Sequence, residues 1–139
     1  MASPFKTKVA MREIVQGLCS YLNELSFRVV DCTDDNWAFY LDEEYAGTIS
    51  ISYDKSNKEY RQIHIGGYYT VLLHHKVVYT ENNVNDIYEI RTSGSTSDTI
   101  NENELDKLDK VKHKMAVLSR NYKLAKGKLK EIKMKKDFT

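Results

Sequence analysis

Cysteine is scarce in this chain of 139 residues, and no long apolar run occurs in it. The two cysteines, Cys19 and Cys32, form no CxxC pair, which excludes a disulfide-rich scaffold, so we expect both thiols to be reduced and structural. No uninterrupted stretch of 18 apolar residues is present, which excludes a transmembrane helix. The opening residues lack a charged segment followed by an apolar core, so we expect no secretory signal and a cytoplasmic protein.

The signatures of common catalytic sites are missing as well. GxSxG, HExxH, GxGxxG and the Walker loop do not occur, and Gly66-Gly67 lacks the Lys and Ser/Thr that phosphate chemistry requires. His74 and His75 are adjacent on an expected strand, where their side chains point to opposite faces and cannot easily share a metal ion. We therefore expect no enzyme, no cofactor and no metal site.

Charge is distributed unevenly along the chain. The formal net charge is +1, but residues 1–100 carry nine Lys/Arg against fourteen Asp/Glu, whereas residues 101–139 carry twelve against six. Between Lys110 and Lys136 eleven basic residues stand against one acid, Glu131. An acidic body followed by a basic tail indicates two surfaces of different kinds.

Hydrophobic periodicity predicts an α+β fold. Apolar residues at helical spacing predict an N-terminal helix from Pro4 to Leu25, opened by Ser3-Pro4. From Phe27 the period changes to two, and TISISY, residues 48–53, is the cleanest strand pattern. Gly66-Gly67 predicts a bulge or a hairpin tip, and residues 68–80 fit either strand or buried helix, with strand favoured by their Val, Tyr and Thr. Short strands joined by tight turns predict an antiparallel sheet of five or six strands.

The chain divides most naturally near residue 98. TSGSTSDT, residues 92–99, has the composition of a flexible connection, and Thr99 with Glu102 matches a capping box that would start the last helix. We therefore predict a globular α+β domain over residues 1–98 and a long basic, coiled-coil-like helix over residues 99–139, ending near Lys136.

The last helix carries an apolar stripe spaced 3-4-3-4, which predicts a coiled-coil seam or a helix packed on a body. The predicted dimer or partner seam consists of Leu108, Val111, Met115, Leu118, Tyr122, Ala125, Leu129 and Ile132. Val117 and Leu124 widen the apolar surface to one side, which is more typical of a globular helix than of a two-stranded coil.

Lysines flank this seam on both sides. The predicted basic flank consists of Lys112, Lys114, Lys126, Lys128, Lys133 and Lys135. In a plain homodimeric coil these lysines would face each other, so they favour an acidic partner surface. That surface would be the chain's own acidic body, in cis or from a second subunit, an acidic face of another protein, or nucleic acid.

Eight of the ten tyrosines lie in the strand region, where rigid amphipathic side chains suit protein recognition. The predicted sheet recognition surface consists of Tyr60, Arg61, Tyr68 and Tyr69. Because the sheet region is acidic, it is a poor platform for nucleic acid and would instead fit a groove that normally holds nucleic acid.

These features together predict a non-enzymatic protein-binding module, a small homodimeric inhibitor or adaptor without a membrane partner. Small proteins of phages and mobile elements that block a host enzyme have a similar composition. The alternative is a nucleic-acid-binding protein that uses the basic C-terminal helix.

Overall fold

A single antiparallel meander and two helices make up the computed structural model, which describes residues 8–32, 35–56, 58–101 and 103–137. The elements in chain order are α1 (Lys8–Glu24), β1 (Arg28–Cys32), β2 (Asn36–Leu41), β3 (Glu44–Asp54), β4 (Glu59–Tyr79), β5 (Val84–Asn101) and α2 (Lys107–Asp137). The sheet has the order β1-β2-β3-β4-β5, and every neighbouring pair is antiparallel. The predicted α+β architecture with two terminal helices is therefore confirmed.

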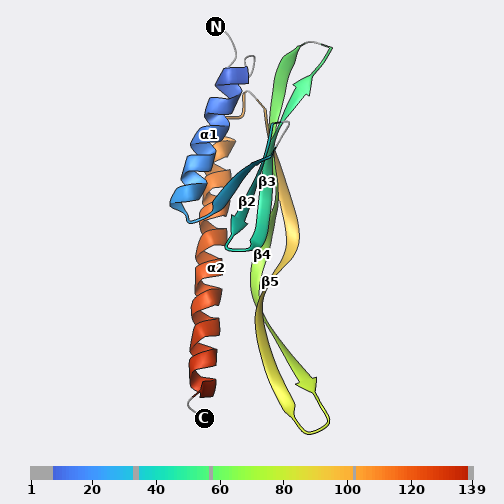
Figure 1. Ribbon diagram of the computed structural model, residues 1–139. Helices are drawn as coiled ribbons and strands as arrows, with labels where there is room; N and C mark the ends of the chain where they lie inside the picture. Colours follow the sequence, from blue (N-terminus) through green and yellow to red (C-terminus); the bar gives the residue numbers. More distant parts are fainter. Residues whose placement is uncertain (1–7, 33–34, 57, 102, 138–139) are drawn as a thin grey trace.

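Both helices lie on the same side of the sheet (Figure 1). β4 and β5 are much longer than the other strands and continue as a two-stranded hairpin, paired from Thr70↔Ser93 to Tyr79↔Val84. We call this hairpin, residues 70–93, the arm. The arm and the second half of α2 extend together past the same end of the sheet, and the β3–β4 hairpin lies at the opposite end (Figure 1).

The core follows from the two periodicities of the sequence. Alternate residues are buried where β3 and β4 pair under the helices, namely Ile49 and Ile51 of β3 and Ile63 and Ile65 of β4. The helices bury their i, i+3, i+4 faces, with Met11, Val15, Leu18 and Leu22 of α1 and Val111, Met115, Leu118 and Tyr122 of α2. Each fully buried aliphatic side chain contributes about 1.5–3 kcal/mol.

Glycines shape the sheet where it bends under the helices. Register shifts between Gly66 and Tyr68 and between Tyr68 and Thr70 show that Gly66-Gly67 forms a bulge, with Gly67 at φ 77°. Residues 68–79 continue β4 as a strand, as the composition favours. Gly47 is required for a different reason, because a Cβ at this position would lie 2.5 Å from Phe39 Cζ and 2.6 Å from the Gly66 carbonyl oxygen.

Two boundary predictions are wrong. Residues 92–99, predicted as a flexible connection, belong to β5, because pairing with β4 outweighs their loop-like composition. The last helix does not begin at Thr99, which pairs with His64 in the sheet; it begins at Lys107. Glu102, the second residue of the predicted capping box, lies outside the described residues, as do residues 1–7 at the predicted start of the first helix.

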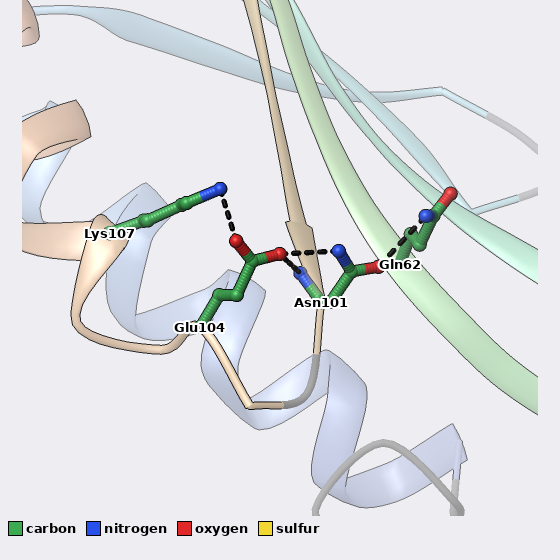
Figure 2. Close-up of polar contacts among 4 residues, drawn as sticks. All are labelled: Gln62, Asn101, Glu104 and Lys107. Atoms are coloured by element: carbon green, nitrogen blue, oxygen red, sulfur yellow. Dashed lines mark hydrogen bonds and ion pairs between the residues drawn. The ribbon is translucent and has the colours of Figure 1, made fainter.

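A polar chain fixes the junction between β5 and α2 (Figure 2). The Glu104 carboxylate accepts hydrogen bonds from the backbone and side-chain nitrogens of Asn101 and forms an ion pair with Lys107. The Asn101 side-chain oxygen in turn accepts a hydrogen bond of 2.8 Å from Gln62 Nε2 on β4. Lys107 and then Asn101 lower the pKa of Glu104. Asn101 and Glu104 have the i, i+3 spacing of a capping box, but their bonds hold the turn between the end of β5 and the start of α2 at Lys107, not the first turn of the helix.

The same substitution at two glycines tests the close approach at Gly47. We expect Gly47→Ala to lower the free energy of unfolding by about 1–3 kcal/mol, because the new methyl group overlaps Phe39 and the Gly66 backbone. Gly17→Ala is the matched control on α1, since a Cβ added there has no neighbour within 4 Å, and it should raise stability by roughly 0.5–1 kcal/mol. Urea denaturation measures both, and equal effects of the two substitutions would contradict the packing described.

Candidate protein-binding groove

The helix α2 has two halves with different surroundings. From Val111 to Tyr122 its apolar seam side chains are buried under the body, with Met115 completely covered. Beyond Tyr122 the seam residues Ala125, Leu129 and Ile132 are only half-buried. Leu124 and Met134, beside them, are 65% and 52% exposed. The same apolar stripe is therefore covered by the body in its first half and open in its second.

Three polar contacts mark where the buried half ends. Ser119 is almost fully buried, and its Oγ donates a hydrogen bond of 2.7 Å to the Leu25 carbonyl oxygen at the end of α1. Three residues later the Tyr122 hydroxyl donates to Asp42 Oδ2 at 2.9 Å, and Lys126 Nζ lies 2.7 Å from the same oxygen. Lys126 and then Tyr122 lower the pKa of Asp42, whereas burial and then Asp42 raise the pKa of Tyr122 to about 12.

An open groove lies between the second half of α2 and the arm. Its first hollow, of about 460 Å³, lies along α2 from Tyr122 to Met134 and reaches Ile90 of β5. Its second hollow, of about 180 Å³, joins α2 to residues 86–88 of the arm. Leu129 and Lys133 line both hollows, so we treat them as one feature and call it the groove.

The groove combines an apolar floor with a basic rim. The apolar residues that line it are Tyr122, Leu129, Ile132 and Met134 of α2 and Ile87, Tyr88 and Ile90 of β5. The lysines that line it are Lys126, Lys130, Lys133 and Lys136. Apolar area gives affinity that is largely independent of salt, and the lysines favour carboxylates at the rim.

Polar contacts link the two strands of the arm, and one further contact joins the arm to α2. The His75 ring stacks on Tyr88 with centroids 4.4 Å apart, and His75 Nε2 lies 2.9 Å from Asp86 Oδ1. Lys136 Nζ of α2 donates a hydrogen bond of 3.3 Å to the Asp86 carbonyl oxygen, which joins α2 to the arm at the far end of the groove. On the arm's other face Lys76 and Arg91 pair with Glu89, and the hydrogen bond from Lys76 is the main reason that the pKa of Glu89 is lowered.

The structure separates the eight predicted seam residues into two groups. Leu108, Val111, Met115, Leu118 and Tyr122 pack against the chain's own core. Ala125, Leu129 and Ile132 are the half-buried remainder, and Leu129 and Ile132 line the groove. For these three a role in dimer or partner contact stays a prediction.

The predicted basic flank is divided in the same way. Lys114 pairs with Asp98 at 2.8 Å, Lys126 pairs with Asp42, and Lys112 Nζ lies 5.4 Å from the centroid of the Tyr21 ring. These three lysines therefore contact acidic or aromatic side chains of the chain's own body. Lys128, Lys133 and Lys135 are exposed on the second half of α2, and Lys133 lines the groove.

The residues of the predicted sheet surface do not form one patch. Tyr60 is partly buried against the core, with its ring 4.9 Å from that of Tyr53, and Arg61, its neighbour on β4, is exposed. The side chains of Tyr68 and Tyr69 lie outside the described part of the structure.

The two cysteines and His64 lie apart from the groove. Both thiols are free, and burial and then Asp31 raise the pKa of Cys19 to about 11. His64 Nδ1 lies 3.2 Å from Thr99 Oγ1. Among the described residues no three His, Cys, Asp or Glu side chains are grouped as metal ligands would be. Within the same part of the chain, no helix has the length and apolar character needed to cross a membrane.

Sequence reasoning missed the arm's half of the groove. Ile87, Tyr88 and Ile90 belong to no candidate site predicted from the sequence, and Lys130 and Met134 lie outside the heptad seam. The sequence contained one indication of it, because the two long strands have apolar residues on both faces. A sheet with one face exposed to water would carry polar residues on that face.

Comparison with family models, curated proteins and solved structures finds no match to this chain.

The Asp42 contact predicts a pH dependence. Because the folded-state pKa of Asp42 is lowered, its contribution to stability is present above the unfolded-state pKa and is lost as the pH falls through the folded-state value. We expect Lys126→Met to raise the pKa of Asp42 and to lower stability at pH 7 by about 0.2–1 kcal/mol, since the pair is half exposed. The difference from the wild type should close at low pH.

Carboxyl-resolved NMR titration gives the pKa, and urea denaturation at several pH values gives the stability. Lys128→Met, at an exposed position of the same helix, removes the same charge without touching Asp42 and should leave its pKa unchanged. An Asp42 pKa that is unaffected by Lys126→Met would refute the contact.

Proposed function

We propose that this chain is a non-enzymatic protein-binding module whose groove holds an acidic, apolar segment of a protein. The observation that supports this most directly is the change along α2. Its stripe is buried on the body as far as Tyr122 and then continues, half-buried and rimmed by lysines, beside the arm. A helix that ended at Tyr122 would suffice for the core, so the added length is best explained by a contact with something else.

The shape and chemistry of the groove favour a protein segment over a small molecule or a nucleic acid. It is elongated, its floor is aliphatic and aromatic, and its charged rim is mostly lysine. Phosphate binding would use the lysines but would leave Leu129 and Ile132 without partners. An amphipathic segment with carboxylates beside its apolar residues would satisfy both.

The role we assign is that of an inhibitor or adaptor, as a small phage or mobile-element protein that occupies a host enzyme would be. Two free thiols fit a reducing compartment such as the cytoplasm. Nucleic-acid binding is the second candidate, and the exposed Lys123, Lys128, Lys130 and Lys135 of α2 favour it.

Three defined probes test the proposal. The first is a labelled helical peptide with leucines at i, i+3, i+4 and i+7 and glutamates elsewhere; the second replaces the glutamates with lysines; the third is a DNA duplex. We expect fluorescence anisotropy to show saturable binding of the acidic peptide, and Leu129→Asp to weaken it about ten-fold or more, because a carboxylate enters the apolar floor.

Ser97→Asp is the matched control, because it adds the same charge at an exposed position of β5 away from the groove. Its affinity for the acidic peptide should equal that of the wild type. Equal binding of both peptides would contradict the proposal. So would binding of the duplex alone with a steep loss of affinity between about 50 and 200 mM salt, which would favour the nucleic-acid alternative.

A further inference from the structure

The outer end of the arm is apolar on the face that continues the groove. Tyr79 and Val84 are direct partners across the hairpin and are 76% and 63% exposed, and Val77, two residues before Tyr79, is 39% exposed. Asp86, which pairs with Val77 across the hairpin, is the residue that Lys136 of α2 contacts. Tyr79 and Val84 lie further out along the arm than this contact. We call residues 77–86 the arm tip.

The charge of the arm tip is opposite to that of the groove. Residues 77–86 contain two acids, Glu81 and Asp86, and no lysine or arginine. From Lys123 to Lys136, α2 carries seven lysines and one acid, Glu131. The arm tip therefore has the two properties that the groove requires of a partner, exposed apolar side chains and negative charge.

Apolar side chains that the arm and the end of α2 expose to water reduce the stability of both elements. A two-stranded hairpin is marginally stable on its own, and a long apolar edge strand invites pairing with another chain. Val77, Tyr79 and Val84 are among the large hydrophobic residues that the described part of the chain leaves exposed. Covering them against another protein surface would stabilise both elements.

A second copy could also pair through α2 alone, but charge opposes this. Helix against helix along Ala125, Leu129 and Ile132 would bring the flanking lysines of the two chains together. The arm tip has no lysine or arginine, so tip against groove avoids that repulsion.

We propose that the segment held in the groove is the arm tip of a second copy of this chain. This inference rests on the proposed function, since it names the occupant of the same groove. In a two-fold dimer each copy supplies one tip and one groove, so the contact between tip and groove forms twice. Tyr79 and Val84 lie against the groove floor near Leu129, and Glu81 lies near Lys133 at its rim.

Sedimentation velocity over roughly two decades of concentration around 10 µM measures the assembly. We expect a reversible dimer for the full chain and an about ten-fold or greater rise in its dissociation constant for Tyr79→Lys. Tyr53→Lys is the matched control, because Tyr53 is 47% exposed near the β3–β4 turn at the other end of the molecule, and its dimer should match the wild type. A wild type that stays monomeric, or a Tyr79→Lys dimer as tight as the wild type, overturns the inference.

A charge exchange tests which surfaces meet. Glu81→Lys and Lys133→Glu should each weaken the dimer about ten-fold, because each homodimer then contains two like-charge contacts. An equimolar mixture of the two variants should restore dimerisation. In the heterodimer the lysine introduced into one tip meets the glutamate introduced into the other chain's groove, and the second contact is the native one. No gain on mixing overturns the tip-in-groove arrangement.

The peptide probes separate this inference from the proposed function. If the chain remains monomeric while the acidic peptide binds and Leu129→Asp releases it, the groove is a docking site for another protein and only the self-contact is wrong. If neither a dimer nor peptide binding is found, both proposals fail.

Discussion

The first half of α2 packs on the sheet through four core side chains, and the buried Ser119 hydrogen-bonds to the end of α1. The four core side chains are those of Val111, Met115, Leu118 and Tyr122. This packing sets the direction of the whole helix. Because an α-helix is stiff over this length, the fifteen residues after Tyr122 continue for about 22 Å in the direction that the first half gives them. The arm leaves the sheet at the same end, so the groove is a consequence of how α2 is seated (Figure 1).

The groove also depends on how the chain distributes its charge. Acids of the body form ion pairs with lysines of α2 as far along the helix as Lys126. Asp98 pairs with Lys114, and Asp42 pairs with Lys126. Past Lys126 the next acid in the helix is Glu131, and lysines dominate the remaining surface. One basic helix thus serves two purposes: its first part is matched by the chain itself, and its second part presents cations beside an apolar floor.

The α+β class, the heptad stripe and an interruption of the strand pattern at Gly66-Gly67 could be predicted from the sequence, because each depends on local spacing or residue type. The sequence left open whether that interruption is a bulge or a hairpin tip, and the register with β5 shows a bulge. The buried and open halves of the stripe could not be told apart, since both have the same period and differ only in what lies opposite. The strand character of residues 92–99 was likewise hidden, because it comes from pairing with β4 and not from their own Ser-rich composition. The arm's contribution to the groove required knowing how far β4 and β5 continue beyond β3.

Hydrogen–deuterium exchange along α2, measured on dilute protein, tests the central claim most directly. The account predicts strong protection of the amides from Val111 to Tyr122, close to the stability of the whole domain, and clearly weaker protection from Lys123 to Lys136. Uniform protection along the helix, or faster exchange in the first half than in the second, would contradict the seating of α2 from which the groove follows.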